Sequence, residues 1–311
     1  MLRFLGGRLV GLVPVLAVAI VATFAAIRAM PGDPVSVMLS DHSADRVMAA
    51  RVAAEYGLDQ PLLVQFGQYL GGILTGQFGL SFRYMHMPVV QVLSDSLVIS
   101  PVLALSALFI ALPLGAFAGA QAALHRNRFQ DTAIIVVLVA GLSIPNFAIA
   151  TFLVYLLSAK ANLLPVAGWG TMRQAVLPVL VLAIPSAAYI ARLSRTFMLE
   201  VLQQDYVRTA RAKGLPERLV IYRHAFRGII VPLITVTGVI FGGLLSNTVV
   251  VETIFNIPGL GRLAVDSIFA RDYPVTMAVV LLFVLFYAAI NLLVDVVCAI
   301  VDPRIRAGVS R

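Results

Sequence analysis

Charged side chains are scarce in this sequence. Only 12% of its 311 residues are Asp, Glu, Lys or Arg, about half the share found in typical soluble domains. Cysteine is scarcer still, and the single Cys298 excludes an intramolecular disulfide framework or a cysteine-rich metal site on this chain. These two shortages exclude an ordinary soluble globular protein and argue against redox chemistry.

Motifs for catalysis and nucleotide binding are also missing. Neither lysine, Lys160 or Lys213, lies in a Gly-x-x-x-x-Gly-Lys-Ser/Thr phosphate-binding loop. The sequence has no His-Glu-x-x-His zinc motif and no Gly-x-Ser-x-Gly nucleophile turn. The four histidines fall on separate predicted loops: His42, His86, His125 and His224. We therefore expect no catalytic activity, no cofactor and no metal ion on this chain, and no nucleic-acid partner.

Long apolar runs are what the sequence has in excess. Hydrophobic residues make up 60% of the chain, and the mean hydropathy is +0.95. A helix that crosses about 30 Å of hydrocarbon needs roughly 20 residues with few charges. Seven charge-free windows of at least 18 residues occur, at 9–27, 60–82, 96–124, 132–159, 174–191, 228–251 and 273–294. The sequence thus predicts an all-α membrane protein that crosses the bilayer several times.

The window 60–82 differs from the other six. It contains five glycines and four glutamines, and Pro61 suits the first position of a helix. Its apolar residues fall on one helical face: Leu62, Leu63, Phe66, Tyr69, Leu70, Ile73 and Leu74. This pattern is typical of an amphipathic helix lying on a surface. We therefore predict six transmembrane helices instead of seven.

The distribution of charge also favours six spans, with both termini in the cytoplasm. In that topology the inner segments carry a net charge of +10 and the outer segments −1, as the positive-inside rule requires. A seventh span would place Arg126, Arg128 and the basic segment 192–227 on the outer face. No small-residue cleavage pattern follows the span 9–27, which predicts an anchor that is not removed.

Residues 30–95 form the longest predicted outer segment. Ser43 is placed to cap a helix that runs to Tyr56, and Gly57 is placed to end it. The amphipathic helix follows. The segment is either a helical extracytoplasmic cap that meets a partner or a folded loop that only stabilises the bundle.

Residues 192–227 form the only sizeable predicted inner segment. Asp205 is expected to cap a short helix there, Gly214 to end it, and Pro216 with Glu217 to begin a second short helix. The exposed chemistry of this helix–break–helix unit is basic. Two interpretations remain open: a solvated loop attracted to anionic lipid, or a docking element for a cytosolic partner.

One ionisable residue, Asp295, lies inside a predicted span, near its inner end. With Asn291 one turn earlier it could bind a proton or cation, but its depth also fits pairing with an arginine at the cytoplasmic boundary. Proton-coupled carriers generally need several such groups. The shortage of carboxylates within the membrane indicates that energy arrives through another subunit.

Polar and small residues within the spans suggest two further roles. The spacings Gly115-x-x-x-Gly119 and Gly238-x-x-x-Gly242 permit close approach of helices. Five polar residues could line a solute path or form hydrogen bonds between helices: Ser143, Asn146, Ser246, Asn247 and Thr248.

Seven short blocks occur along nearly the whole chain. They are 31–34 (Pro-Gly-Asp-Pro), 57–61 (Gly-Leu-Asp-Gln-Pro), 76–82 (Gly-Gln-Phe-Gly-Leu-Ser-Phe), 205–214 (Asp-Tyr-Val-Arg-Thr-Ala-Arg-Ala-Lys-Gly), 258–262 (Pro-Gly-Leu-Gly-Arg), 271–275 (Arg-Asp-Tyr-Pro-Val) and 302–306 (Asp-Pro-Arg-Ile-Arg). With these blocks in this order, the sequence resembles the permease subunits of bacterial ATP-binding-cassette importers for dipeptides, oligopeptides, glutathione and nickel.

The resemblance implies the type I importer permease fold, with six transmembrane helices, a helical extracytoplasmic cap and a cytoplasmic coupling helix. It implies an N-terminal region with the first span at 1–29, an extracytoplasmic segment at 30–95, a permease core at 96–302 and a cytoplasmic tail at 303–311.

The resemblance also implies that residues 205–214 dock in a groove on an ATPase subunit. The residues it assigns to this coupling helix are Asp205, Tyr206, Arg208, Thr209, Ala210, Arg211, Lys213 and Gly214. The broad importer pattern has Glu-Ala-Ala and then Gly. Here Ala210 and Gly214 match, but Arg208 and Thr209 replace Glu-Ala. The proline that ends the broad pattern corresponds to Pro232, which lies 18 residues beyond Gly214, farther than in sugar-type importers. An ionic role for the Glu position therefore does not apply to this chain.

The partners implied by the resemblance are a second homologous permease, two cytosolic ATPases that bind ATP and Mg, and an extracytoplasmic solute-binding protein, in the lipid of a bacterial inner membrane. The solute would be a peptide or related small solute, and glutathione or a nickel chelate would use the same mechanism. A self-contained channel or secondary carrier is the alternative of another class, but it leaves the basic inner unit without a partner.

Overall fold

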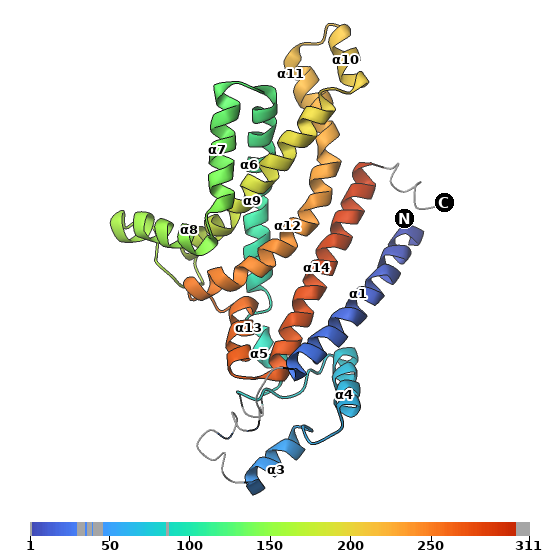
Figure 1. Ribbon diagram of the computed structural model, residues 1–311, viewed down its shortest axis with the longest axis vertical. Helices are drawn as coiled ribbons and strands as arrows, with labels where there is room; N and C mark the ends of the chain where they lie inside the picture. The colour runs from blue at the N-terminus through green and yellow to red at the C-terminus, as the bar shows by residue number, and fades with distance from the viewer. Residues whose placement is uncertain (1, 30–34, 36–38, 40–45, 85–86, 303–311) are drawn as a thin grey trace. The chain divides into compact units, whose positions relative to one another are not determined.

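The computed structural model describes residues 2–29, 35, 39, 46–84 and 87–302. These ranges are helical apart from short connections, and the one extended pairing within them is an isolated bridge between Leu80 and Pro88. The helices are α1 (Leu2–Arg28), α3 (Arg46–Glu55), α4 (Leu62–Thr75), α5 (Val89–Ser94), α6 (Ile99–Leu124), α7 (Phe129–Ser143), α8 (Asn146–Leu153), η2 (Val154–Lys160), α9 (Met172–Val201), α10 (Asp205–Ala212), α11 (Glu217–Leu219), η3 (Val220–Ala225), α12 (Phe226–Ile254), α13 (Leu260–Phe269) and α14 (Tyr273–Val301) (Figure 1). The predicted all-α class is confirmed.

The chain divides into two compact units. Unit 1 comprises Met1–Arg8, Pro101–Ile257 and Tyr287–Arg311, and unit 2 comprises Leu9–Ser100 and Pro258–Phe286. Several predictions lie outside the described residues: the block 31–34, the cap at Ser43, His42 and His86, and the tail 303–311.

Five helical stretches are long and apolar enough to cross a membrane. They are Gly6–Arg28, Val89–Leu124, Met172–Val201, Glu217–Ile254 and Tyr273–Val301. A bent pair, Phe129–Ser143 with Asn146–Lys160, brings the number to six if it is one span. Five of the six predicted spans therefore correspond to long continuous helices.

The third predicted span, 132–159, is not a single straight helix, which corrects the sequence interpretation. α7 ends at Ser143, and α8 turns away from it by 102° (Figure 1). The cause is Pro145, because proline lacks an N–H and disfavours the α conformation in the residue before it. Ile144 accordingly adopts an extended conformation, with φ −85° and ψ 122°. α7 alone, with 15 residues, is about 22 Å long, which is short for a hydrocarbon core of about 30 Å.

The two glycine pairs pack as their spacing predicts. A Cβ on Gly115 would lie 2.6 Å from the Ala187 carbonyl oxygen, and one on Gly119 would overlap that of Ala191, so α6 meets the backbone of α9 directly. On α12, Gly238 and Gly242 face side chains of α14. Both contacts lie within unit 1, where small residues let long helices approach closely.

In unit 2, α4 confirms that the window 60–82 is not a span, because the helix has only 14 residues. Two details differ from the prediction. Pro61 has ψ 144° and precedes the first helical position instead of occupying it. The predicted apolar face is only partly covered: Phe66 packs on Phe24, whereas Leu63 is exposed and Gln65 is buried.

Asp272 joins two of the sequence blocks inside unit 2. Its buried carboxylate accepts hydrogen bonds from the Ser81 hydroxyl and from the backbone N–H groups of Phe82 and Arg83. It also accepts the Val275 N–H in the first turn of α14, at 3.4 Å. The block 76–82 is thereby attached to the start of α14, which gives a physical reason for a Ser-Phe and an Asp at these positions.

Candidate functional site

The predicted coupling segment is a short helix, α10, with one buried face. Val207 and Ala210, three residues apart, are both buried, and α10 packs on η3. Tyr206 is about half exposed, and its hydroxyl lies against Gly228 at the beginning of α12, where a Cβ would be only 2.6 Å away. Burial raises the pKa of the Tyr206 phenol. α10 is therefore fixed to the helices of unit 1 by a small apolar base.

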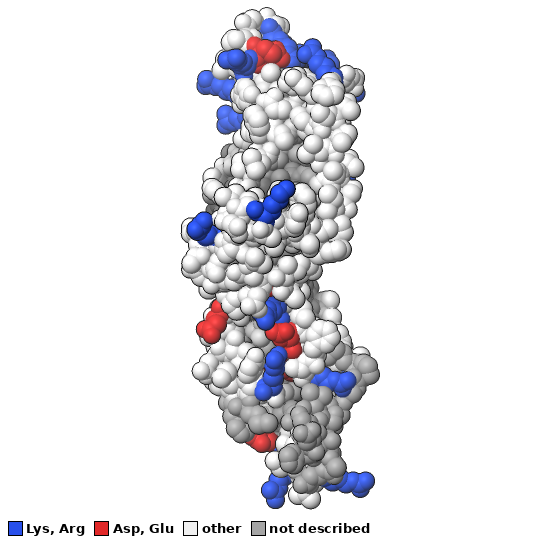
Figure 2. Space-filling view, turned by 90° about the vertical axis from the view of Figure 1, so that its left-hand side faces the viewer, with Lys and Arg blue, Asp and Glu red and all other residues white. Residues whose placement is uncertain are grey.

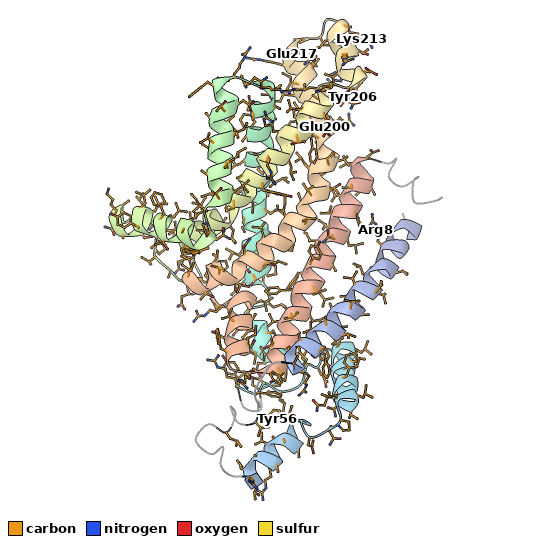
Figure 3. All side chains as sticks on the ribbon, viewed as in Figure 1. Arg8, Tyr56, Glu200, Tyr206, Lys213 and Glu217 are labelled. Carbon is orange, nitrogen blue, oxygen red and sulfur yellow. The ribbon has the colours of Figure 1, made fainter. Side chains whose placement is uncertain are left out.

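The opposite face of α10 is polar and open. The side chains of Asp205 and Arg208 are 99% and 70% exposed, and their closest N–O distance is 3.8 Å. Thr209, Arg211 and Lys213 are also exposed. Tyr206, Lys213 and Glu217 lie at the end of unit 1 that carries α10 and α11 (Figure 3). Blue side chains, with one red patch among them, gather at this end in Figure 2, next to an uncharged surface. A partner could contact this exposed face of α10 without displacing its buried base.

Two features hold the connection after α10. Gly214 adopts a left-handed conformation, with φ +74°, that glycine tolerates without steric cost. Arg211 then forms an ion pair with Glu217, with Nη2–Oε1 at 2.7 Å and Nε at 3.2 Å from both carboxylate oxygens. The Glu217 carboxylate raises the pKa of the Arg211 guanidinium. Sequence reasoning had named both residues but not this pair.

Two local predictions for this segment were wrong. The N-cap of α10 is Gln204, and Asp205 is its first helical residue with a side chain that caps nothing. The second short helix is not separate, because α11, η3 and α12 run as one stretch from Glu217 to Ile254. Pro216 precedes this stretch, with ψ 140°, so the proline starts the long fifth span. Only four residues, 213–216, thus separate the end of α10 from the start of a membrane-length helix.

The five polar candidates for a solute path are placed differently from one another. Ser143 is exposed at the end of α7, and Asn146 is partly buried at the start of α8, on either side of the bend. On α12, Ser246 and Asn247 are exposed, and the Ser246 hydroxyl donates to the Gly242 carbonyl. Thr248 is fully buried and donates to the Leu245 carbonyl. α8 packs against α12 in unit 1, so Asn146 lies on a helix that neighbours the one carrying Ser246 and Asn247.

Asp295 pairs with an arginine, as one interpretation of the sequence expected. Its Oδ2 lies 3.1 Å from Nε of Arg8, within unit 1. Three further buried acids were missed. Asp131 in α7 accepts both Nε and Nη2 of Arg195 at 2.8 Å, and Glu252 in α12 and Asp272 are fully or almost fully buried. Charge-free windows exclude such residues: Asp131 and Asp272 each lie one position before a window, and Glu252 lies one position after another.

Comparisons with known proteins agree with this architecture. Residues 111–307 match the family model described as binding-protein-dependent transport system inner membrane component, and residues 1–101 match the model of its N-terminal part. The chain is 39% identical to the glutathione transport system permease protein GsiC of Escherichia coli K12, over 98% of this chain and 99% of the relative. It is also 39% identical to a candidate peptide transport system permease of Brucella abortus strain 2308, over 94% and 96%.

One solved structure shares the fold. It is a chain of the inward-facing MetNI methionine ABC transporter, with a TM-score of 0.58 and 15% identity, and the match covers 68% of this chain and 97% of that one.

Proposed function

Because this chain belongs to the family of binding-protein-dependent transport system inner membrane components, it is a non-catalytic permease subunit of an ATP-driven importer, and we propose that its solutes are short peptides or glutathione. The observation that carries the solute class is identity of about 39% over nearly the full length to permeases named for peptide and glutathione transport. A channel or an ion-coupled carrier would leave the exposed basic end of unit 1 without a partner, whereas an ATP-driven importer provides one.

We propose that α10 is the element through which ATPase subunits move this chain. Its exposed residues are available to a cytosolic partner, while Val207 and Ala210 attach it to unit 1. The sites assigned to this contact are Asp205, Tyr206, Arg208, Thr209, Arg211, Lys213 and Gly214. Ala210, which the resemblance also assigns to the coupling helix, belongs to its buried base.

Motion of α10 would reach the membrane through a stiff lever. The helical stretch from Glu217 to Ile254 has 38 residues, which corresponds to about 57 Å of helix. Ser246 and Asn247 lie in its far half and would move with it. In this scheme, ATP closes the two ATPases, their grooves draw the α10 helices of two permeases together, and the pathway between the permeases opens to the outer side.

The proposed assembly contains a second homologous permease, two cytosolic ATPases that hold ATP and Mg, and an extracytoplasmic solute-binding protein. Both termini and α10 face the cytoplasm of a bacterial inner membrane. The excess of basic residues on that side supports this orientation.

The test is uptake of radiolabelled dipeptide and glutathione by the complete importer in liposomes, together with its ATPase rate. We expect Arg208→Glu with Arg211→Glu to abolish uptake and its stimulation of ATP hydrolysis, because the reversed charges oppose docking. Arg218→Glu on α11 is the matched control, since Arg218 is an exposed basic residue outside α10. Full uptake with normal solute-stimulated ATP hydrolysis in the double variant would refute the role of α10. A wild-type importer that moves neither dipeptide nor glutathione would refute the solute class.

A further inference from the structure

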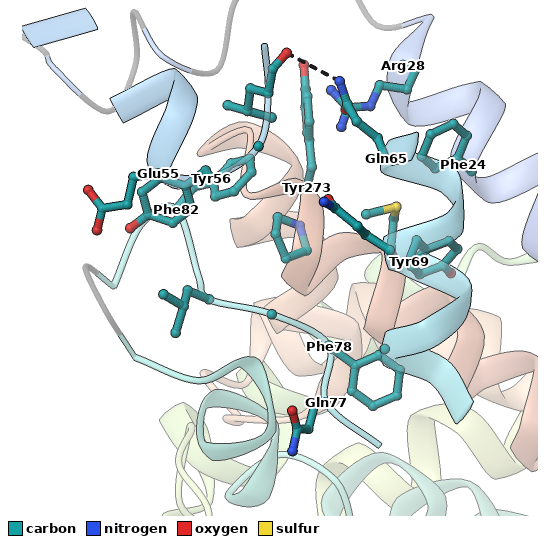
Figure 4. Close-up of a pocket in the computed structure, with 18 residues that line it drawn as sticks. Phe24, Arg28, Glu55, Tyr56, Gln65, Tyr69, Gln77, Phe78, Phe82 and Tyr273 are labelled. Carbon is teal, nitrogen blue, oxygen red and sulfur yellow. Dashed lines mark hydrogen bonds between the residues drawn. The ribbon is translucent and has the colours of Figure 1, made fainter. Parts of the chain in front are cut away.

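Unit 2 contains a cavity of about 310 Å³ that no part of the coupling scheme uses. The end of α1, α4 and the start of α14 surround it, together with the connections 55–58 and 77–82 (Figure 4). Its volume lies at the lower limit of the roughly 300–1,000 Å³ that small-molecule sites enclose.

The polar atoms in this cavity are oriented but incompletely bonded. Gln65 is only 7% exposed, and its Nε2 donates to the carbonyls of Leu58 and Gln60 at 3.2 and 2.7 Å. Two acceptors on one side fix which end of the amide is nitrogen. The remaining atom, Oε1, is buried and has no hydrogen-bond partner among the described residues. A buried acceptor left in this state costs free energy that a ligand N–H would recover.

Tyr69 provides a second group of this kind. Its hydroxyl is buried and also lacks a partner within the described part of the chain. Burial raises the pKa of Tyr69 to about 12, so the phenol stays protonated and can donate a hydrogen bond at any physiological pH. Two lining residues, Gln65 and Tyr69, therefore each carry a buried polar atom without a partner among the described residues, and the acceptor on Gln65 has a fixed direction.

The cation that lines the cavity is Arg28. Its guanidinium carbon lies 5.6 Å from the centre of the Phe24 ring and 5.6 Å from that of the Tyr273 ring. No carboxylate of the described residues pairs with it. Glu55, the acid at the rim, lies on the opposite side of the cavity from Arg28 (Figure 4). A stacked guanidinium of this kind keeps its N–H edge available for a bidentate anion.

Aromatic rings continue from Arg28 around the cavity. Neighbouring ring centres are 5.1 to 6.1 Å apart, so the wall can hold an apolar side chain. The pairs are Phe24 with Tyr69, Phe82 with Tyr273, and Tyr56 with Phe82.

We propose that this cavity binds the C-terminal end of a peptide. The terminal carboxylate accepts from Arg28, the last amide N–H donates to Gln65 Oε1, and the last side chain lies among the rings. A lipid phosphodiester would supply an anion for Arg28 but has no neighbouring amide N–H for Gln65 Oε1. The cavity, at about 310 Å³, is also small for an acyl chain. The peptide source, either the transported solute of the proposed function or the C-terminus of a protein partner, is decided by experiment.

The first experiment measures binding by calorimetry to the full chain in nanodiscs, without solute-binding protein. The probes are the dipeptide Ala-Phe, glutathione and the C-terminal amide of Ala-Phe. We expect Ala-Phe to bind and the amide to bind roughly tenfold or more weakly, because a charged hydrogen-bond acceptor is lost. Arg28→Gln should weaken Ala-Phe to the level of the amide, and Gln65→Leu should also weaken it. Arg51→Gln, which changes an exposed arginine of α3 outside the cavity, should have no effect.

Equal binding of the acid and the amide, or unchanged binding in Arg28→Gln, would overturn the proposal. So would displacement of Ala-Phe by anionic lipid in the nanodisc, because it would show a lipid site. Circular dichroism and thermal unfolding of each variant establish that it is folded, and Arg28→Lys, which keeps the charge, should retain part of the binding.

A second arm separates the two peptide sources. If the C-terminus of the binding protein occupies the cavity, removing its last residues should weaken its association with the importer. Ala-Phe should then also compete with the binding protein for the importer. If the solute occupies it, Arg28→Gln should reduce uptake without changing association of the binding protein. Peptide uptake by an importer whose cavity binds no peptide would overturn the cavity proposal alone, and amide-sensitive binding without any peptide or glutathione uptake would overturn the proposed function alone.

Discussion

The Asp272 carboxylate accepts the backbone N–H of Phe82 at 3.1 Å, across 190 positions of sequence. The same buried carboxylate receives the Ser81 hydroxyl and caps the first turn of α14 through Val275. This one side chain thus connects the segment before α5 to the start of α14. Three donors far away in the sequence converge on this carboxylate: the Ser81 hydroxyl and the N–H groups of Phe82 and Arg83.

Replacing Asp272 should destabilise unit 2 markedly. Asp272→Ala leaves the Phe82 and Arg83 N–H groups without their acceptor in a buried place, and each unpaired group costs about 1–3 kcal/mol. We expect a clear fall in the thermal unfolding temperature of the detergent-solubilised chain. Asp266→Ala, which removes a half-exposed acid of α13, is the control. Equal unfolding temperatures of the two variants would contradict the anchoring role.

The buried and exposed ion pairs of unit 1 should differ in strength. Asp131 is 3% exposed and accepts two hydrogen bonds of 2.8 Å from Arg195, whose side chain is 24% exposed, so Asp131→Ala should cost about 1.5–3 kcal/mol by removing a charged hydrogen-bond partner. Asp205→Ala removes an exposed partner of Arg208 and should cost at most about 1 kcal/mol. Chemical denaturation of both variants measures the difference. A loss for Asp205→Ala as large as that for Asp131→Ala would be incompatible with these environments.

The close approach of α6 and α9 should not tolerate a side chain at Gly119. Gly119→Val places a branched group where the Ala191 carbonyl and the Ser194 side chain already lie. Because backbone atoms cannot move aside cheaply, we expect a loss of about 1–3 kcal/mol or more, as for other overpacked sites. Gly11→Val, at a position with no neighbour within 4 Å, is the matched control. Similar stabilities of the two variants would argue against tight α6–α9 packing.

Pro145 should maintain the bend between α7 and α8. In Pro145→Ala the N–H of residue 145 is restored and Ile144 is released toward helical geometry, so the 102° bend should open. Spin labels at Val137 and Tyr155, both exposed, report this as a longer interspin distance, in a chain with Cys298 replaced by Ser. Pro113→Ala, in the continuous helix α6, serves as the comparison. An unchanged distance in Pro145→Ala would mean that packing, and not proline, sets the bend.

Tyr69 should make stability depend on pH in the alkaline range. Its folded pKa of about 12 exceeds the ordinary value of 10.0 because burial disfavours the phenolate. The unfolded chain therefore releases this proton first as the pH rises, so the contribution is complete below about pH 10 and decreases between pH 10 and 12. From pH 8 to 11, the unfolding temperature of wild type should fall relative to that of Tyr69→Phe, because only the wild type has a phenol that titrates at this position. A constant difference over this range would place the hydroxyl in water.

The sequence alone determined the class of the protein and located five of its membrane-length helices. Hydrophobic runs and the shortage of charge are properties of local composition, and a bilayer imposes a minimum length on any helix that crosses it. Turn chemistry was equally local, since Gly214 adopts the positive φ expected at the end of α10. The spacing of Gly115 and Gly119 predicted close packing without naming the partner helix.

Only the tertiary structure decided which polar groups matter and what they meet. Asp131, Glu252 and Asp272 are acids that composition assigns to water, and they are buried because distant donors or unit packing surround them. The sequence pattern placed Gln65 and Tyr69 on an amphipathic helix but did not show that they line a cavity between α1, α4 and α14. It also did not show that each has a buried polar atom without a partner among the described residues. Burial and hydrogen bonding depend on segments far apart in sequence, and no local pattern contains that information.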